Sequence, residues 1–341
     1  MSISINENAI QRILLIRLSS IGDVLLASPV AEKLRQHFPK AHITWVVETK
    51  SKDVIEGNPF VDEVLVWSRK SWNEHARQKN EYLQLIRLNY NFFQSIRALK
   101  ADLVINMQDD FRSAFLAHIS GAKYRICPAN FRGTNKCFTN LLVDNTVEKH
   151  ITLQYVSLLS PLGIDVKDAH MTMPFTSKDI DYANSLLSEH GLQPKQFVIL
   201  NPSTSSTKKI WPSNCYAALA DLLIEKCNTP VVFLGADSDR ALVADITCKM
   251  KHKAYNFAGK TTLKQLGALV QKAKLFISGD TGPLHITAAV GTPTVSLFGP
   301  TNPERYAPLG DLHIVLTGKT MHDIKPSEVF QTACTFLVCE D

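Results

Sequence analysis

This sequence lacks the features that mark several large classes of protein. No apolar run reaches the ~20 residues that a membrane-spanning helix needs, and the charged opening MSISINENAIQR does not have the form of a signal peptide. The seven cysteines are odd in number, widely spaced and without a C-x-x-C pair, so they predict reduced thiols rather than a disulfide framework or a zinc site. We therefore expect a protein that neither spans a membrane nor is secreted.

Two common nucleotide-binding motifs are also missing. The chain contains neither G-x-G-x-x-G after its first strand-like run nor a G-x-x-x-x-G-K-[ST] loop. Nicotinamide-dependent oxidoreductases and P-loop nucleoside triphosphatases are therefore disfavoured. Nucleic-acid binding is disfavoured as well, because no recognisable module interleaves basic residues with exposed aromatic ones.

What the chain does have is the length and composition of an ordinary two-domain protein, with 341 residues, of which 45% are hydrophobic and 20% charged. The formal net charge of +5 is unevenly spread, since the segment from Arg69 to Lys136 holds twelve Lys or Arg against five Asp or Glu. Such a segment suits an anionic partner, or it is simply a solvated helix face. Composition leaves both interpretations open.

Short apolar runs alternate with stretches of helical periodicity along most of the chain. The strand-like runs are Arg12–Leu18, His42–Val47, Val61–Trp67, Asp102–Met107, Phe197–Leu200, Pro230–Leu234, Leu275–Ser278 and Thr294–Phe298. The helical stretches are Val24–His37, 82–99, Pro212–Cys227, Asp239–Met250, Leu263–Gln271 and Pro283–Val290.

This alternation is typical of parallel sheets built from right-handed βαβ units. The pattern stops and restarts around the polar, proline-containing stretch Met171–Asp179. The sequence therefore predicts an α/β protein with two Rossmann-like, doubly wound domains, residues 1–175 and 176–341. Ligands of such folds bind at the carboxyl ends of the strands, and we expect them in the cleft between the domains.

The first strand exit holds the sequence RLSSIGD, from Arg17 to Asp23. Ser19, Ser20 and Gly22 predict a turn of small residues, and Asp23 is expected at the N-terminus of the next helix. Two interpretations of Asp23 stay open at this point. It is either a helix cap, which is a common use of aspartate, or a general base that takes a proton from an attacking sugar hydroxyl.

The sharpest motif is SGDTGPLH, from Ser278 to His285, at a strand exit in the second half. Thr281 and Gly282 predict a tight turn before a helix whose free N–H groups and dipole favour an anion such as phosphate. Asp280 is expected to orient the turn or to bind a sugar hydroxyl. His285 either has a structural role or donates a hydrogen bond to a leaving diphosphate.

The loop NPSTSSTKKIWP follows the first strand of the second half. Its Ser203, Thr204 and Lys209 either belong to a plain polar connection before a helix with proline at its start, or they form a clamp for a diphosphate.

Two pairs of carboxylates follow other strands. Asp237 and Asp239 either cap a helix or accept hydrogen bonds from ribose or sugar hydroxyls. Asp109 and Asp110 are adjacent, so their side chains point apart, and no third ligand is evident. A dedicated metal site is therefore not expected.

Several stretches together resemble the bacterial heptosyltransferases of lipopolysaccharide core assembly, glycosyltransferase family 9. They are RLSSIGDVLLASPV, WVVE, NPSTSSTKKIWP, FLGADSD and SGDTGPLHITAAVGTPTVSLFGPTNP, and they follow the family's order over most of the chain. MHDIKPSEVF resembles the family's entry into its terminal helix, and WVVE and WSRK are most similar to the members that add the first heptose to Kdo.

The resemblance implies a GT-B fold of two facing domains. It implies an inverting transfer of heptose from ADP-heptose to Kdo-lipid A or a heptosyl acceptor of the lipopolysaccharide inner core, with no metal and no cofactor beyond the donor substrate. Asp23 would be the general base. The donor site would consist of Ser203, Thr204, Lys209, Asp239, Asp280, Thr281, Gly282 and His285. Acceptor contacts would come from Arg17, Ser19, Ser20, Arg69, Lys70, Gln108 and Arg112.

A lipid-linked acceptor and the lack of a membrane span predict a cytoplasmic protein at the inner face of the inner membrane, held there by salt-sensitive contacts of the segment 69–136. Two alternatives remain. One is a related GT-B transferase with another nucleotide sugar or acceptor, and the other is a non-catalytic protein that binds a nucleotide sugar or a glycolipid.

Overall fold

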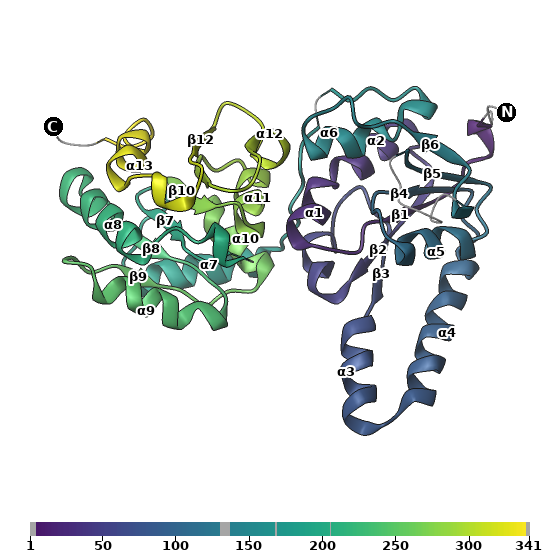
Figure 1. The fold of residues 1–341 in the computed structure, drawn as a ribbon, viewed down its shortest axis with the longest axis horizontal. Helices are drawn as coiled ribbons and strands as arrows, with labels where there is room; N and C mark the ends of the chain where they lie inside the picture. Colours follow the sequence, from purple (N-terminus) through teal and green to yellow (C-terminus); the bar gives the residue numbers. More distant parts are fainter. Residues whose placement is uncertain (1–4, 130–136, 168, 205, 339–341) are drawn as a thin grey trace. The chain divides into compact units, whose positions relative to one another are not determined.

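The computed structural model describes residues 5–129, 137–167, 169–204 and 206–338. The chain divides into two compact units, Met1–Thr172 and Met173–Asp341. Within the described residues each unit contains one parallel sheet of six strands, with helices packed around it (Figure 1). This confirms the predicted α/β class with two doubly wound sheets.

Unit 1 is built on a sheet with the strand order β3-β2-β1-β4-β5-β6. Its strands are β1 Arg12–Ile16, β2 His42–Glu48, β3 Glu63–Trp67, β4 Leu103–Asn106, β5 Tyr124–Pro128 and β6 Leu141–Val143. The central strands are nearly continuous apolar runs because both faces of the sheet are covered. The order reverses between β1 and β4, and such a switch point is where ligands of doubly wound folds bind.

Unit 2 repeats the same order, since its sheet reads β12-β11-β10-β7-β8-β9. Its strands are β7 Val198–Asn201, β8 Val231–Phe233, β9 Tyr255–Asn256, β10 Leu275–Gly279, β11 Thr294–Phe298 and β12 His313–Thr317. The switch point of unit 2 therefore lies between β7 and β10. The two strand exits with the richest predicted chemistry in this half, the 201–212 loop and the SGDTGPLH motif, are the exits at this point.

The helices connect successive strands. In unit 1 they are α1 Ile21–Leu26, α2 Pro29–His37, α3 Arg69–Lys79, α4 Tyr82–Ala98, α5 Phe111–Ile119 and α6 Ile151–Ser157, with short 3-10 turns at Glu7–Ala9, Thr49–Val54 and Ser160–Leu162. In unit 2 they are α7 Ser177–Glu189, α8 Ser213–Cys227, α9 Arg240–Cys248, α10 Leu263–Gln271, α11 Gly282–Ala289, α12 Pro303–Tyr306 and α13 Pro326–Ala333, with 3-10 turns at Thr207–Lys209, Asp237–Asp239 and Met321–Asp323.

The prediction of one helix over Val24–His37 is wrong, because the segment forms two helices, α1 and α2. Pro29 stands at the first position of α2. Proline has no N–H to donate to the preceding turn, so it favours the start of a new helix over the continuation of the old one. The strands β5, β6, β9 and β12 were not predicted. The strands β6 and β9 have only three and two residues, β12 is only partly buried, and the apolar run of β5 is interrupted by Arg125.

The cysteine prediction also needs a correction. Cys127, Cys137, Cys215, Cys248 and Cys334 carry free thiols, as expected. Cys227, at the end of α8, is disulfide-bonded. The expectation that all thiols are reduced is therefore wrong for this residue.

The helices α3 and α4 form a hairpin that extends beyond the sheet of unit 1 (Figure 1). Aromatic rings hold its base. Trp67, the last residue of β3, stacks on Phe92 of α4 with the ring centroids 5.4 Å apart, and Trp72 of α3 meets the same ring edge-on at 6.4 Å. The Trp67 indole N–H also donates to Asn89 Oδ1 at 3.1 Å. The hairpin is thus fixed to the sheet at its proximal end.

Candidate functional site

Asp23 lies in the first turn of α1, directly after β1. The N-cap residue of this helix is Ser20, and Asp23 closes a capping box. Its Oδ2 accepts hydrogen bonds from the Ser20 backbone N at 3.3 Å and from Ser20 Oγ at 3.0 Å. Arg17 Nη2 approaches the same oxygen at 2.9 Å, and 28% of the Asp23 side chain is exposed. All three contacts use Oδ2, so Oδ1 takes no part in them and stays available to a substrate.

Arg17 joins the two strand exits at the switch point of unit 1. Its Nη1 donates to the carbonyl oxygen of Met107, just after β4, at 3.1 Å, while Nη2 pairs with Asp23 after β1. The guanidinium also lies over the ring of Tyr155, 5.3 Å from its centroid. In this arrangement Arg17 positions the Asp23 carboxylate, and its predicted contact with the acceptor stays a prediction.

The exit of β4 is ordered by hydrogen bonds around Asp110. Gln108 is buried, its Oε1 accepting from the Leu18 N–H at 2.8 Å and its Nε2 donating to Asp110 Oδ2 at 2.7 Å. Asp110 is the N-cap of α5, where Oδ1 accepts from the Ser113 N–H at 2.8 Å, and Arg112 Nε donates to Oδ2 at 3.0 Å. Burial raises the pKa of Asp110, but the hydrogen bonds from Ser113, Arg112 and Gln108 lower it by more, so the net pKa is below its ordinary value. Asp110 is therefore a structural anion rather than a free metal ligand.

Glu48, the last residue of β2, collects three cations although its side chain is only 6% exposed. Arg112 Nη1 lies 3.2 Å and Arg69 Nη2 3.4 Å from Oε1, and Lys70 Nζ lies 3.4 Å from Oε2. Three of the predicted acceptor residues thus converge on one carboxylate. We call Glu48, Arg69, Lys70, Asp110 and Arg112 the Glu48 cluster, which carries three cations and two carboxylates. The cluster keeps one net positive charge close to the switch point.

A largely buried ion pair of unit 2 joins the two exits of its switch point. Lys209 Nζ, after β7, lies 2.6 Å from Oδ2 of Asp280, directly after β10, and His285 Nε2 of α11 lies 3.7 Å from Oδ1. Burial raises the pKa of Asp280, while its hydrogen bonds to His285 and Lys209 and their charges lower it by more, so the net pKa lies below its ordinary value. Lys209 itself is held near the sheet edge by Trp211, which is buried and donates to the Ile324 carbonyl at 3.0 Å.

Thr281 forms the turn between β10 and α11. It is the N-cap of α11, and its Oγ1 accepts from the Leu284 N–H at 3.3 Å and lies 3.1 Å from Ser278 Oγ. Asn201, the last residue of β7, donates from Nδ2 to the same Ser278 hydroxyl at 3.2 Å. The Asn201 Oδ1 and the His285 Nδ1 are both buried without a hydrogen-bond partner. The turn is therefore tightly built and still has polar atoms to offer a ligand.

Thr204, through its hydroxyl, and Ser203, through its backbone carbonyl, take part in hydrogen bonds within the 201–212 loop. Thr204 Oγ1 donates to the Ser206 carbonyl at 2.7 Å, and the Ser203 carbonyl accepts from Asn201 Nδ2 at 3.2 Å. The backbone here passes so close to β10 that a Cβ at Gly279 would lie 3.3 Å from the Lys209 carbonyl oxygen. Glycine at this position lets the loop and the strand end approach each other.

Of the two carboxylates after β8, Asp239 acts as a cap and Asp237 forms an ion pair. Asp239 Oδ2 accepts from the Ala236 N–H at 2.7 Å, and Asp237 pairs with Arg240 at 2.7 Å. The cap interpretation of Asp239 is thus confirmed, while its contact with a nucleoside ribose stays a prediction.

The model for "Glycosyltransferase family 9 (heptosyltransferase)" matches residues 89–333, well over half of the chain. This chain belongs to glycosyltransferase family 9. It is 31% identical to lipopolysaccharide heptosyltransferase 3 of Escherichia coli strain K12, over 82% of this chain and 80% of that one. It is 25% identical to the lipopolysaccharide core heptosyltransferase OpsX of Haemophilus influenzae, over 89% of this chain and 83% of that one.

Solved structures agree with the family. A family 9 glycosyltransferase from Veillonella parvula is 27% identical and superposes with a TM-score of 0.81, over 96% of this chain and 97% of that one. The E. coli heptosyltransferase WaaC with ADP superposes with a TM-score of 0.77 at 20% identity, over 95% of this chain and 99% of that one. The GT-B-like fold predicted for this family 9 protein is confirmed.

One residue of this family 9 site, Glu48, was given no role by sequence reasoning. It is the final residue of β2, so the rule that functional residues follow strands does not identify it. A polar residue at the end of an otherwise apolar strand, as in HITWVVE, is the signal that finds it.

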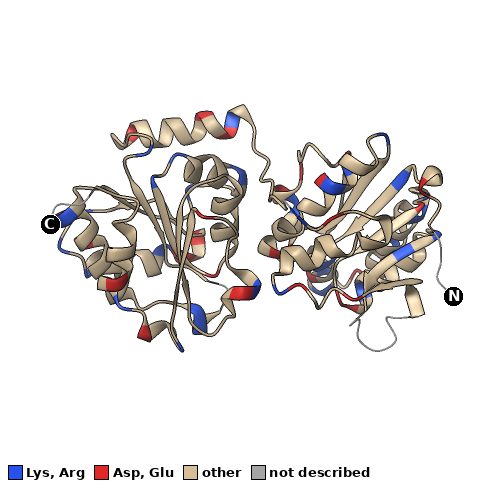
Figure 2. Ribbon diagram, turned by 90° about the horizontal axis from the view of Figure 1, so that it is seen from above, with Lys and Arg blue, Asp and Glu red and all other residues tan. Residues whose placement is uncertain are grey.

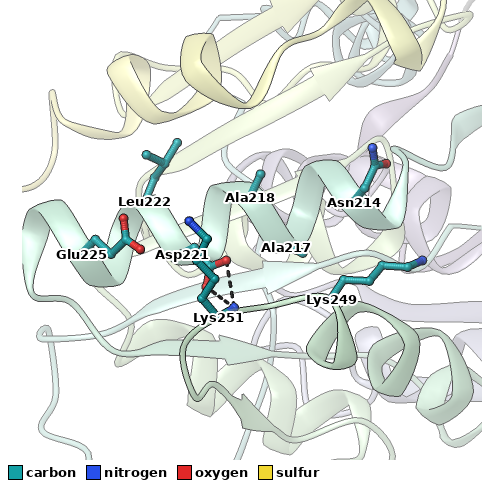
Figure 3. A pocket seen from close by; sticks show the side chains of 8 residues that line it. All are labelled: Asn214, Ala217, Ala218, Asp221, Leu222, Glu225, Lys249 and Lys251. Atoms are coloured by element: carbon teal, nitrogen blue, oxygen red, sulfur yellow. Dashed lines mark hydrogen bonds between the residues drawn. The ribbon is translucent and has the colours of Figure 1, made fainter.

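A surface pocket of about 420 Å³ lies between α8 and the end of α9 (Figure 3). Its lining residues are Asn214, Ala217, Ala218, Asp221, Leu222, Glu225, Lys249 and Lys251. The Asp221 carboxylate accepts from the N–H groups of Lys251 and His252, at 3.0 Å for the shortest bond to each. Because this carboxylate is used to hold the chain after α9 and no predicted site residue lines the pocket, it is distinct from the candidate site.

Proposed function

We propose that this family 9 protein is an inverting heptosyltransferase, which moves a heptose from ADP-heptose to a hydroxyl group of the lipopolysaccharide inner core. The observation that carries the proposal is the Lys209–Asp280 ion pair beside the Thr281 turn, at the switch point of unit 2. The names of the relatives support the choice of heptose, and the lipopolysaccharide core as the acceptor.

In this proposal unit 2 binds the donor. A lysine ammonium group has three N–H donors, and Asp280 takes one from Lys209, which leaves others for the diphosphate. The N-terminus of α11, at Gly282, adds free backbone N–H groups and the positive end of a helix dipole. His285 lies in the first turn of the same helix. Together these groups stabilise the negative charge that grows on the leaving ADP, so the reaction is proposed to need no metal and no further cofactor.

Unit 1 supplies the general base and the acceptor contacts. Asp23 Oδ1 takes the proton of the acceptor hydroxyl as that oxygen forms a bond to the anomeric carbon of heptose. The bond between this carbon and the diphosphate oxygen breaks at the same time, and ADP leaves with the electron pair. Attack from the face opposite to the leaving group inverts the anomeric configuration. The net positive Glu48 cluster attracts the anionic inner core, of which Kdo is a part.

The acceptor is lipid-linked in this proposal, so the protein is expected to work at the cytoplasmic face of the inner membrane. In the part of the chain that the structure describes, no helix is both long and apolar enough to cross a bilayer. Peripheral attachment through the basic segment 69–136 would bring the protein to its acceptor.

The substitution Asp23→Asn tests the base assignment. It keeps the shape of the side chain but removes its basicity, so turnover is expected to fall by about a thousandfold while ADP affinity stays within about twofold. A radiolabelled transfer assay and calorimetric titration with ADP measure the two quantities.

Asp179 offers a matched control. It closes the capping box of α7, where its Oδ2 accepts from the Thr176 N at 2.8 Å and Oγ1 at 2.7 Å. If Asp23 only capped its helix, Asp23→Asn and Asp179→Asn would reduce stability alike and leave turnover nearly intact. That result would contradict the assignment.

The two alternative functions, another GT-B transferase and a non-catalytic binding protein, are distinguished by the response to different nucleotide sugars and by whether transfer occurs. Thermal stabilisation by ADP-heptose, but not by GDP- or UDP-sugars, is expected for the heptosyltransferase. A stronger response to another nucleotide sugar would favour a related transferase. Binding without transfer to any core acceptor would favour a non-catalytic protein.

A further inference from the structure

The distal half of α4 exposes an apolar face. None of the residues from Tyr82 to Tyr90 is buried. The exposed fractions of its large apolar side chains are 52% for Tyr82, 85% for Leu83, 65% for Ile86 and 58% for Tyr90. Their spacing of one, three and four residues places them on one side of the helix. A contiguous exposed apolar face of this kind marks an interaction surface.

The charges of the hairpin that carries this face are mostly positive. The hairpin, residues 69–100, holds seven Lys or Arg against two Asp or Glu, an excess that equals the net charge of +5 of the whole chain. Elsewhere basic and acidic residues are interspersed in both units (Figure 2). Arg77, Lys79, Arg87 and Arg97 of the hairpin are all exposed. An apolar stripe with tyrosines and flanking cations fits the interface of a bilayer with anionic headgroups.

The hairpin also connects this face to the proposed acceptor site. Arg69 and Lys70 of the Glu48 cluster are the first residues of α3, and a helix of this length extends about 16 Å. Because Trp67 and Phe92 fix the hairpin at its base, its distal end keeps a set distance from the cluster. A headgroup bound at the cluster can therefore remain attached to a lipid in the surface on which the hairpin rests.

We propose that the α4 face docks on an anionic lipid surface, with Tyr82, Leu83, Ile86 and Tyr90 entering the boundary between headgroups and acyl chains. The cations of the hairpin contact the anionic headgroups. This inference rests on the proposed function only in that the acceptor is lipid-linked. It adds to that proposal a defined docking face and a hydrophobic contribution to membrane affinity, which salt does not screen.

Flotation of the full-length protein with vesicles tests the docking face. Binding is expected to vesicles of phosphatidylcholine with phosphatidylglycerol, and to be weaker with phosphatidylcholine alone. The double variant L83S/I86S is expected to lose about tenfold in vesicle affinity, because it removes two inserting side chains. The matched control is L309S/L312S, whose side chains are similarly apolar, are 45% and 48% exposed in the wild type and lie in unit 2. It is expected to bind like the wild type.

The contribution of the hairpin cations to vesicle binding is tested by a second pair of variants. R77Q/K79Q is expected to weaken binding to anionic vesicles severalfold, whereas K178Q/K253Q, which removes two exposed lysines of unit 2, leaves it unchanged. High salt is expected to reduce the wild-type affinity without abolishing it.

Insertion itself is measured with Leu83→Trp. Brominated phospholipids are expected to quench the added fluorescence of this variant, and not that of Leu309→Trp. Equal quenching of the two, or no binding of the wild type to anionic vesicles, would overturn the inference. The inference would also be overturned if, without lipid, L83S/I86S had a lower mass than the wild type in sedimentation. That result would mean that the face binds a second copy of the protein. Transfer to a soluble, delipidated acceptor is measured on the same variants, so that a failure of the proposed function is seen separately.

Discussion

Asp23 and Asp280 each follow a strand that borders the switch point of its own sheet, β1 and β10, and they have different surroundings. Asp23 is partly exposed and uses one oxygen for its structural contacts, whereas Asp280 is buried with the Lys209 ammonium group near one oxygen and the His285 ring near the other. The first arrangement suits a group that takes up a proton, and the second suits a fixed anion that positions Lys209. Sequence position alone predicts both residues as candidates, but only the contacts separate their roles.

The Glu48 cluster marks the limit of prediction at this scale. Arg69, Lys70 and Arg112 were predicted from the family resemblance, and the anion that they share was not. Glu48 is at the end of β2, while its partners follow β3 and β4, so the cluster exists only after three strands are aligned. A single sequence contains no local signal for such a convergence.

Asp280→Asn is expected to lower the free energy of unfolding by about 2 kcal/mol at neutral pH, because it leaves Lys209 without its buried partner. The pKa of Asp280 in the folded protein lies below the ordinary value of 3.8. The unfolded chain therefore takes up the proton first as the pH falls. The stability due to the ion pair is complete above about pH 5 and is lost as the pH falls through the lowered folded-state pKa.

Urea unfolding of wild type and variant between about pH 7 and pH 3 measures this dependence. The difference in the free energy of unfolding between wild type and variant is expected to be constant from neutral pH down to about pH 5 and to shrink below about pH 4. Asp165→Asn serves as the control, since this side chain is 69% exposed. A difference that grew toward acid pH would contradict the role given to Asp280.

At the scale of elements, the sequence predicts the central strands well and the hairpin poorly. The strands β1, β4, β7 and β10 are apolar runs that are buried on both faces of their sheets. Such a run can be recognised in the sequence without knowing which residues pack against it. The stretch 82–99 was predicted as a helix, with α4 at Tyr82–Ala98, but α3 was not. The sequence of α3 is strongly polar, and only Ala76 is buried, so it has no apolar period to detect. Its attachment depends on aromatic contacts with α4.

Phe92→Ala tests this attachment. Phe92 is 7% exposed and contacts Trp67, Trp72 and Phe93, so the variant is expected to destabilise unit 1 by about 3–4 kcal/mol. Chemical unfolding followed by near-ultraviolet circular dichroism measures the loss. Phe111→Ala, which removes a ring that is 56% exposed, is the comparison and is expected to cost about 1 kcal/mol or less. Equal losses would show that the ring stack does not hold the hairpin.

At the scale of the whole molecule, each unit has its own core. Leu14 and Val104 belong to that of unit 1, and Val198 and Phe233 to that of unit 2. A ligand that binds one unit therefore stabilises that unit first. The periodicity of the sequence predicts two sheets, because the alternation of strands and helices is interrupted once, but it contains no information on the geometry of either ligand site.

Hydrogen exchange with and without ADP tests this division. ADP at about 100 times its dissociation constant is expected to protect β7, β10 and the turn before α11, since it adds about 2.7 kcal/mol to the stability of the unit that binds it. Peptides from β1 and β4 are expected to exchange as before. Protection centred on β1 and β4 instead would assign the nucleotide to the other unit.

The identical strand order of the two sheets has a consequence for mutational scanning. In each sheet only the first and fourth strands border the switch point, and the four described strand exits after β1, β4, β7 and β10 hold most of the residues to which we assign chemistry. A map of substitution tolerance should therefore contain the same profile twice. In each half, two short intolerant polar segments would follow intolerant apolar ones, while exits without an assigned residue, such as those after β5, β9 and β12, would accept change. The Glu48 cluster would add intolerant positions at the end of β2 and after β3 in unit 1 alone. Such a duplicated profile is a fingerprint that needs no ligand, no assay of transfer and no knowledge of the substrate.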